Sequence, residues 1–290
     1  MAKTESASLS RRGFLALGAS CTFGLAMALS GCNSGGGETA GPDGKKKLVV
    51  AMELAYPPFE TKDDAGNPSG LSVDFIKGFG EAYGYDVQID NTSFDGLIPA
   101  LQTNKADVVL SSMTITPERQ ESVDFTDPYA VAQLAILANK NSGINSIDDL
   151  NQPNKTVAVK TGSTGDVYAT KHLTQANIVR LADESACVTE VVQGKADGFL
   201  YDQLTIYRNN QANPDTTSAV FIPFQDPEMW GMAVKKGNTE LKDQLNEYIA
   251  QCKEDGEFDR LTEKYLHDEK AAFDSLGFRW FFDFEGEQGQ

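Results

Sequence analysis

The chain has 290 residues, 40% of them hydrophobic, and a formal net charge of −17 at pH 7. This length is sufficient for one large domain or for two smaller ones with buried cores. Such a negative charge disfavours a surface that binds nucleic acid or anionic lipid headgroups. It does not restrict a small ligand, because a single arginine can dominate the field of its own pocket.

Residues 1–31 have the composition of an export signal and are left out of the fold prediction. A twin-arginine pattern, Ser-Arg-Arg-Gly-Phe-Leu at residues 10–15, overlaps an apolar run at 14–29 that is too short for a convincing transmembrane helix. The run ends in Leu-Ser-Gly-Cys, which resembles a bacterial lipobox, so we expect cleavage before Cys32 and lipidation of its thiol. The alternative is cleavage after Ala28, which leaves Cys32 as a free thiol.

The segment that follows is rich in glycine and polar residues. We expect residues 32–46 to form a flexible tether that reaches roughly 20 Å by random-coil scaling. Signal, anchor and tether together predict a protein held at the outer side of the cell membrane.

The remaining cysteines and histidines do not indicate a metal or redox centre. Cys187 and Cys252 lie far apart in the sequence, so isolated buried thiols are favoured over a disulfide. His172 and His267 have no metal-ligand spacing, and there is no phosphate loop, zinc pattern or Ser-His-Asp arrangement. We therefore expect no cofactor, no metal and no classical catalysis.

After the tether, short apolar strands alternate with amphipathic helices. The first group comprises strands at 48–52, 87–89 and 106–110 and helices at 73–83 and 94–102. Ser72 is the candidate N-cap of the first helix, whose stripe of Phe75, Ile76 and Phe79 would face the core. Strands that alternate with helices favour a parallel α/β sheet over an antiparallel sandwich.

A second group repeats this arrangement. It comprises strands at 134–138, 156–159, 178–181 and 198–200 and helices at 147–150, 165–173 and 184–193. A strand at 231–234 and two acidic helices at 238–254 and 257–266 close the predicted fold. The aromatic segment from Phe273 onward has no clean period, and we assign it no structure.

The segment at residues 111–119, Ser-Ser-Met-Thr-Ile-Thr-Pro-Glu-Arg, has the features of a carboxylate receptor. Thr116 is a candidate N-cap with Pro117 at the first helical position. Arg119 then takes the third position, where an acidic residue or glutamine is usual, and such a broken local rule is typical of a functional site. A guanidinium beside helix N–H groups and the hydroxyls of Ser112 and Thr114 could hold a carboxylate. The alternative is a surface arginine on a short helix.

Six motifs in order carry a resemblance to a known family. They are Gly-Leu-Ser-Val-Asp at 70–74, Phe-Asp-Gly-Leu-Ile-Pro-Ala-Leu at 94–101, Met-Thr-Ile-Thr-Pro-Glu-Arg at 113–119, Asp-Phe-Thr-Asp-Pro-Tyr at 124–129, Val-Ala-Val-Lys-Thr-Gly-Ser-Thr at 157–164, and Gly-Lys-Ala-Asp at 194–197 leading to Asp202. Each motif is weak, but six in register are strong. Over residues 48–266 the chain resembles the extracytoplasmic solute-binding proteins of polar amino acid ABC transporters, solute-binding protein family 3.

The resemblance implies an α/β fold of the two-lobed periplasmic-binding-protein type (type II), with two crossover hinge segments near 129–132 and 226–230. The first lobe would comprise residues 47–130 and 228–268, and the second lobe residues 131–227. Residues 269–290 remain a tail of unknown role.

The resemblance also implies a ligand-binding set of Arg119, Asp202, Thr114, Ser112, Thr164, Ser163, Tyr56, Phe94, Glu53 and Lys160. Arg119 would hold the α-carboxylate of an amino acid, together with backbone N–H groups of Thr114 and Thr164. Asp202 would hold the α-ammonium, helped by the Ser112 carbonyl and the Thr114 hydroxyl. The alternative role for Asp202 is to cap the helix that starts at Gln203, and both roles are compatible.

Two positions of this set bear on the ligand side chain. Lys160 would repel a basic ligand, and Glu53 would repel an acidic one, whereas an amide could accept from Lys160 and donate to Glu53. The alternative is that Glu53 and Lys160 pair only with each other. Tyr56 and Phe94 would sandwich the aliphatic part of the ligand, the alternative being ordinary core aromatics.

The resemblance favours a monomeric, lipid-anchored receptor that binds glutamine or a similar polar amino acid and delivers it to ABC permease and ATPase subunits. Two alternatives stay open. Relatives of this fold include a cyclohexadienyl (arogenate-type) dehydratase, which needs a positioned general acid, and Glu53 is the only cleft acid without a firm role. A sensor or adhesin without a transporter is the other.

Overall fold

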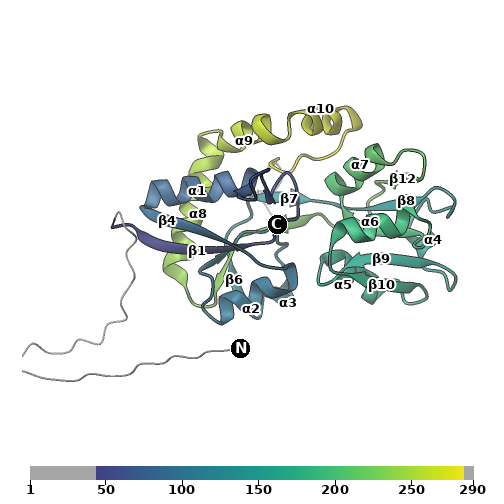
Figure 1. The fold of residues 1–290 in the computed structure, drawn as a ribbon, viewed down its shortest axis with the longest axis horizontal. Helices are drawn as coiled ribbons and strands as arrows, with labels where there is room; N and C mark the ends of the chain where they lie inside the picture. Colours follow the sequence, from purple (N-terminus) through teal and green to yellow (C-terminus); the bar gives the residue numbers. More distant parts are fainter. Residues whose placement is uncertain (1–43, 284–290) are drawn as a thin grey trace, which may run out of the picture. The chain divides into compact units, whose positions relative to one another are not determined.

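The computed structural model describes residues 44–283, which form two α/β lobes joined by a pair of strands (Figure 1). The export signal, Cys32, residues 33–43 of the tether and residues 284–290 lie outside the described residues. Within residues 44–283, no helix combines the length and the apolar composition that crossing a membrane requires.

The first lobe contains a five-stranded mixed sheet. Its order is β4 (Tyr85–Asn91), β1 (Lys46–Met52), β5 (Val108–Val109), β14 (Ala233–Lys235) and β6 (Val123–Phe125). β1 is parallel to β4 and β5, whereas β14 is antiparallel to β5 and β6. The prediction of a parallel sheet is therefore right for β4, β1 and β5 but wrong for β14. The reason is that the chain reaches β14 on its return from the second lobe and not through a helical crossover.

Helices cover this sheet. They are α1 (Leu71–Tyr83), the single 3₁₀ turn η1 (Phe94–Gly96) with α2 (Leu97–Gln102), α3 (Pro117–Gln120), α8 (Thr239–Glu254) and α9 (Glu257–Tyr265), with a small hairpin of β2 (Thr61–Lys62) and β3 (Pro68–Ser69). Phe75, Ile76 and Phe79 of α1 are buried as predicted, and the Phe75 ring lies 5.2 Å from that of Tyr248 in α8.

The predicted start of α1 is wrong. The helix is capped by Gly70 and not by Ser72, whose side chain is fully buried inside the first turn. Gly70 has a φ of 121°, and a Cβ at this position would lie 2.4 Å from the carbonyl oxygen of Phe59. Only glycine fits this close approach, so the backbone of residue 70 determines where the helix begins.

The second lobe is also built on a mixed sheet. Its order is β10 (Asn177–Leu181), β9 (Thr156–Lys160), β11 (Gly198–Asp202), β8 (Leu134–Asn139) and β12 (Thr217–Val220), and its helices are α4 (Ile147–Leu150), α5 (Thr164–His172), α6 (Glu184–Val192) and α7 (Gln203–Ala212). Cys187 lies in α6, and Cys252 lies in α8 of the first lobe. Both thiols are buried and unpaired, which confirms the prediction of isolated cysteines within the described residues.

Two short strands join the lobes. β7 (Ala130–Ala132) and β13 (Glu228–Trp230) pair in antiparallel fashion, with Met229 opposite Val131. The segment that leads to Arg119 adds to this ribbon, because Thr114 forms a bridge with Trp230. The crossover thus brings Glu228 and Trp230 next to residues of the first lobe.

The segment to which the sequence analysis assigned no structure begins with a helix, α10 (His267–Leu276), drawn in yellow across the top of Figure 1. On the second lobe, the Phe273 ring lies 5.9 Å from that of Tyr207, and the Phe278 ring lies 4.6 Å from that of Phe221. The helix was not predicted because Phe273 is the one buried residue within it, so its sequence has no repeating apolar stripe.

The residues after α10 return to the first lobe. The Phe281 ring packs 5.2 Å from Phe59 and 5.3 Å from Trp230, and the Phe281 carbonyl accepts the N–H of Val131 at 2.8 Å. Trp280 and Phe281 are almost completely buried. The C-terminal segment, residues 267–283, therefore contacts both lobes and the strand pair between them.

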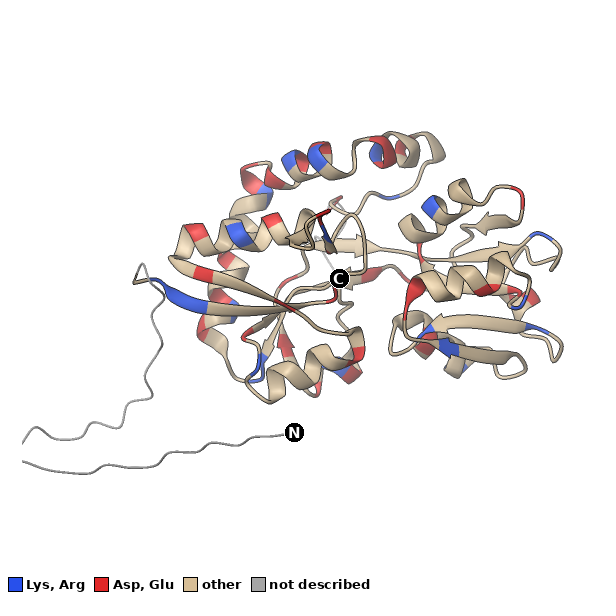
Figure 2. Ribbon diagram, viewed as in Figure 1, with Lys and Arg blue, Asp and Glu red and all other residues tan. Residues whose placement is uncertain are grey.

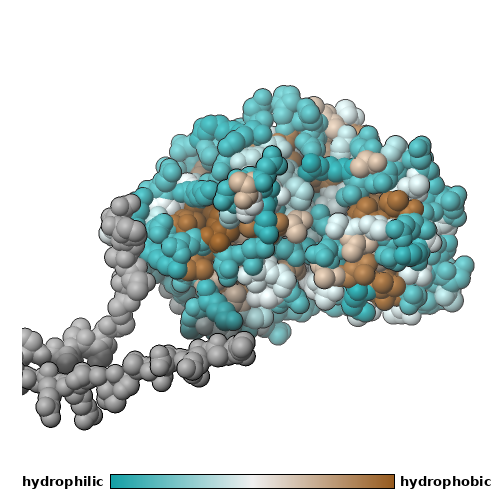
Figure 3. Space-filling model, viewed as in Figure 1, coloured by the Kyte–Doolittle hydropathy of each residue, from teal (hydrophilic) through white to brown (hydrophobic). Residues whose placement is uncertain are grey.

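The surface reflects the acidic composition. Asp and Glu lie on helices of both lobes (Figure 2), and the face shown in Figure 3 is mainly hydrophilic, with hydrophobic residues in separate small groups. This face therefore presents no single large apolar area.

Candidate ligand-binding site

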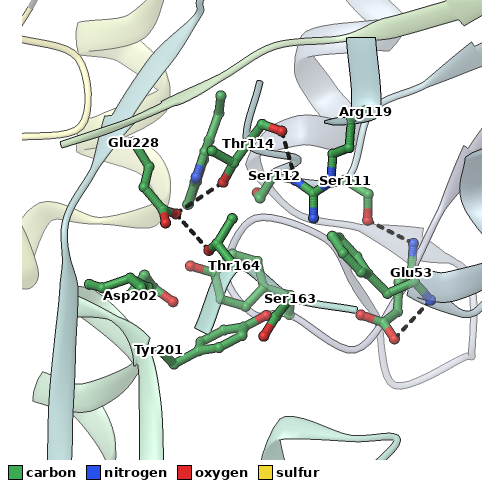
Figure 4. A pocket seen from close by; sticks show the side chains of 14 residues that line it. Glu53, Ser111, Ser112, Thr114, Arg119, Ser163, Thr164, Tyr201, Asp202 and Glu228 are labelled. Carbon is green, nitrogen blue, oxygen red and sulfur yellow. Dashed lines mark hydrogen bonds between the residues drawn. The ribbon is translucent and has the colours of Figure 1, made fainter. Parts of the chain in front are cut away.

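A pocket lies between the lobes (Figure 4). It is lined by Glu53, Tyr56, Phe94, Ser111, Ser112, Thr114, Arg119, Leu134, Ser163, Thr164, Tyr201, Asp202, Glu228 and Trp230. Nine of the ten residues in the predicted ligand-binding set are among them. The tenth, Lys160, does not line the pocket, but its Nζ donates a hydrogen bond to the Glu53 carboxylate. Both lobes and the crossover strand β13 therefore contribute to one site.

Arg119 lies on α3 with the predicted cap. Its backbone N–H donates to Thr116 Oγ1 at 3.2 Å, and Pro117 is the first helical residue. However, α3 has only four residues, so Arg119 belongs to the last turn as much as to the first. The proposed conflict with the helix N-terminus is therefore not the reason for its position.

Other contacts hold the Arg119 guanidinium. Nη1 donates to the Thr114 carbonyl at 2.7 Å, and Nη2 donates to the Gly162 carbonyl of the second lobe at 3.1 Å. Burial lowers the pKa of Arg119, an effect that the nearby Glu228 opposes. Because a guanidinium has five N–H donors, these two bonds leave donors for an anion in the pocket.

Asp202 follows β11 and has two distinct oxygens. Oδ1 accepts the backbone N–H groups of Leu204 at 2.9 Å and Thr205 at 3.1 Å, so it caps α7. Oδ2 is buried and accepts no hydrogen bond of good geometry among residues 44–283, although the Tyr56 hydroxyl is close by. Burial raises the pKa of Asp202, and the Thr205 N–H and the Tyr56 hydroxyl oppose this shift. The carboxylate thus caps a helix with one oxygen and leaves the other available to a cation.

Aromatic rings form the walls. Tyr56 is stacked on Phe59 at 5.4 Å and meets Tyr201 and Trp230 edge-on at about 6 Å. Phe94 lies between two cations, 5.3 Å from the Arg119 guanidinium carbon and 5.4 Å from Lys160 Nζ. The sequence analysis missed Tyr201 and Trp230, although the position of Tyr201 directly before Asp202 was a usable signal.

Glu53 and Lys160 form an ion pair behind Phe94. Lys160 Nζ donates to Glu53 Oε2, and Glu53 Oε1 accepts the Phe94 N–H at 3.3 Å. Ser111 Oγ accepts the Glu53 N–H at 3.0 Å, and Lys160 is 1% exposed. In the structure the two charges therefore pair with each other, as in the alternative considered for them from the sequence.

Glu228 is the main functional candidate that the sequence analysis missed. Its Oε2 accepts the hydroxyls of Thr114 at 3.0 Å and Thr164 at 2.9 Å, and its Oε1 accepts the Gln225 amide at 2.8 Å (Figure 4). Burial raises the pKa of Glu228, and the Thr164 hydroxyl most strongly opposes the shift. No local pattern marks Glu228, because its partners lie 114 and 64 positions away.

Ser112 has an unusual backbone conformation and a buried acidic partner. Its φ of 47° is in the left-handed region, which is rare for serine and is often found at functional sites. The Ser112 hydroxyl lies 3.1 Å from both carboxyl oxygens of Glu60, which is fully buried. Burial raises the pKa of Glu60 to about 8.

This shift predicts a pH dependence of stability. Folded Glu60 keeps its proton up to about pH 8, whereas the unfolded chain releases it near the ordinary value of 4.5. The free energy of unfolding should therefore fall as pH rises between these values, by at most about 1.4 kcal/mol per pH unit for one group. Glu60→Gln should flatten this slope in denaturant titrations of the ligand-free protein at pH 5.5, 6.5 and 7.5.

Glu184 provides the control, because burial also raises its pKa to about 8. In Glu60→Gln, the free energy of unfolding should still fall with pH by the part that Glu184 contributes. In the double variant with Glu184→Gln, the contributions of both residues should disappear. Equal slopes for the wild type and Glu60→Gln would contradict the assignment to Glu60.

Known proteins with similar sequences cover nearly the whole described region. Residues 48–268 match the family model described as bacterial extracellular solute-binding proteins, family 3. The chain is 34% identical over 246 residues to the "Probable histidine-binding protein" of Neisseria gonorrhoeae, covering 83% of this chain and 91% of that protein. It is 32% identical over 264 residues to the "Arginine-binding extracellular protein ArtP" of Bacillus subtilis (strain 168), covering 90% of this chain and 100% of that protein.

Two solved structures share the architecture. The ancestral amino acid-binding protein AncCDT-1, described as a precursor of cyclohexadienyl dehydratase, has a TM-score of 0.69 and 38% identity over 76% of this chain and 94% of its own. An ancestral arginine-binding protein bound to glutamine has a TM-score of 0.70 and 35% identity over 76% of this chain and 97% of its own. These similarities confirm the predicted fold class.

Proposed function

Since the chain belongs to the bacterial extracellular solute-binding proteins, family 3, we propose that it is a lipid-anchored receptor that binds glutamine or a similar polar amino acid and delivers it to an ABC importer. Lipidation of Cys32 and the permease and ATPase partners are parts of this proposal, as is a monomeric state.

The observation that carries the proposal is the separation of two unlike charges across the pocket. Arg119 of the first lobe has donors left for a carboxylate, and Asp202 Oδ2 of the second lobe is a buried acceptor with no cation beside it and no well-formed hydrogen bond in the described chain. A free amino acid carries both complementary groups. Because each lobe holds one charge, the ligand binds the closed arrangement more tightly than the open one.

The Glu53–Lys160 ion pair favours glutamine over ligands whose side chains are basic or acidic. Glu53 lines the pocket, so a terminal amide can donate to it with its nitrogen, and the amide oxygen can accept from Lys160 once the Glu53–Lys160 bond opens. A basic side chain would meet Lys160, and an acidic side chain would meet Glu53, each with a like charge.

A binding screen tests the ligand class. In thermal-shift and calorimetric titrations of residues 45–290 with the common amino acids, glutamine should give the largest stabilisation. A ligand at one hundred times its Kd adds about 2.7 kcal/mol to the free energy of unfolding. Lys160→Met should weaken glutamine binding by about 10-fold or more and favour lysine and arginine, because Glu53 loses its cation.

The matched control is Lys195→Met, which removes a lysine from an exposed ion pair with Glu190 and should leave the ligand order unchanged. If the wild type binds arginine or histidine more tightly than glutamine, the choice of side chain is wrong while the amino acid receptor stands.

The dehydratase alternative lacks a supporting observation. It requires a general acid that is free to reach a substrate, whereas Glu53 is occupied by Lys160 and the Phe94 N–H. We therefore propose binding without catalysis.

A further inference from the structure

One carboxylate oxygen joins the two lobes at the pocket. Thr114 follows β5 of the first lobe, and Thr164 is the first residue of α5 in the second lobe. Both hydroxyls donate to Oε2 of Glu228, which itself belongs to the crossover strand β13 (Figure 4). Glu228 is 8% exposed, so water does not compete freely for these bonds.

The direction of these hydrogen bonds determines what each hydroxyl can offer to a ligand. A threonine hydroxyl has one proton and two lone pairs. When its proton points to Glu228, only the lone pairs remain for other partners, so the hydroxyl can accept but not donate. An ionised Glu228 therefore turns Thr114 and Thr164 into acceptors. Burial raises the pKa of Glu228, and the two hydroxyls oppose this shift more strongly than the Arg119 charge does.

We propose that Glu228 is a positioning residue that fixes the Thr114 and Thr164 hydroxyls as hydrogen-bond acceptors for the α-ammonium of the ligand. Asp202 Oδ2 supplies the opposite charge, and the two hydroxyls supply oriented acceptors, one from each lobe. The inference rests on the proposed function, because it concerns how the same pocket recognises an amino acid. This arrangement explains why the pocket would prefer a ligand whose α carbon carries an ammonium group, with its three N–H donors, over a ligand with only a methylene at that position.

The test compares amino acids with counterparts that lack only the α-ammonium. The probes are glutamine with glutaramate, histidine with 3-(imidazol-4-yl)propanoate and arginine with 5-guanidinopentanoate, titrated calorimetrically into the wild type and Glu228→Gln. The glutamine side chain has the same shape but can donate, so it should disrupt the acceptor state of the hydroxyls. We expect the affinity for the amino acid to fall about 10-fold or more, with little change for its counterpart.

Two further variants distinguish a Glu228 that orients the threonine hydroxyls from a Glu228 that only stabilises the crossover strands. Thr114→Val should cause a selective loss of the same kind, and the loss in the double variant with Glu228→Gln should be smaller than the product of the two single losses, because Glu228 acts in part through the Thr114 hydroxyl. Glu190→Gln, which neutralises an acid far from the pocket, should change nothing. If Glu228→Gln does not fold, the Thr114→Val comparison alone decides.

The outcomes distinguish the inference from the proposed function. An equal loss for the amino acid and its counterpart, or no loss for either, would show that Glu228 only braces the crossover and would overturn the inference. Failure of the wild type to bind any of the three amino acids would overturn the proposed function, and the inference with it.

Discussion

Replacing Arg119 with alanine is expected to abolish amino acid binding at concentrations that saturate the wild type. The guanidinium is the cation of the first lobe whose free donors face the pocket, and its loss would leave a buried ligand carboxylate without a counter-charge. Breaking such a pair costs about 3–5 kcal/mol, which corresponds to a decrease in affinity of roughly 100-fold to 4,000-fold. Calorimetry and thermal shifts with glutamine measure the effect directly.

Arg180→Ala is the matched control for this variant. Arg180 pairs with Asp166 at 2.9 Å on the second lobe and is not among the residues that line the pocket. Its removal should leave affinity within a few-fold of the wild type. A normal ligand-induced shift in Arg119→Ala would show that the carboxylate is held elsewhere, and the proposed orientation of the ligand would then be wrong.

Asp202→Asn is expected to weaken amino acid binding by roughly 100-fold and, at the same time, to stabilise the ligand-free protein. Asparagine retains an acceptor oxygen for the cap of α7 but lacks the charge that Oδ2 leaves unpaired. Burial raises the pKa of Asp202, so the ionised carboxylate destabilises the fold at pH values above its folded pKa. The gain in stability should be largest at neutral pH and should shrink as pH falls through that value.

Denaturant unfolding at several pH values, with calorimetry on the same samples, checks both parts of this result. Asp149→Asn is an informative comparison, because the Asn145 N–H lowers the pKa of Asp149 in the cap of α4. That substitution should reduce stability at neutral pH, the opposite sign to Asp202→Asn. Unchanged affinity in Asp202→Asn would remove Asp202 from the ligand site.

The sequence predicted those parts of the fold that depend on local patterns. Alternating strands and helices, the stripe of α1 and the cap at Thr116 follow from nearest neighbours in the chain, and the structure has them. The start of α1 was missed because it depends on the approach of Gly70 to the carbonyl of Phe59. The direction of β14 was missed because it depends on the route of the chain through the second lobe.

The same distinction applies to the site. The resemblance to the family pointed to nine residues that line the pocket, but it did not point to Glu228 or Trp230, which become pocket residues only when β13 crosses back between the lobes. Arg119 is a different case. It was selected because a cation at a helix N-terminus breaks a local rule. Arg119 does line the pocket, but α3 is a single turn, so the local reason does not explain its position.

The C-terminal segment has a consequence for how the protein releases its cargo. Residues 269–283 continue beyond the part of the chain that matches the family model and attach to both lobes as well as to the two crossover strands. Separation of the lobes therefore requires the Phe221–Phe278 and Tyr207–Phe273 contacts to open or the whole segment to follow one lobe. On the proposed function, this additional attachment would slow the separation of the lobes, so a bound amino acid would dissociate more slowly. The receptor would then keep its amino acid in solution and release it when docking on the proposed importer forces the lobes apart.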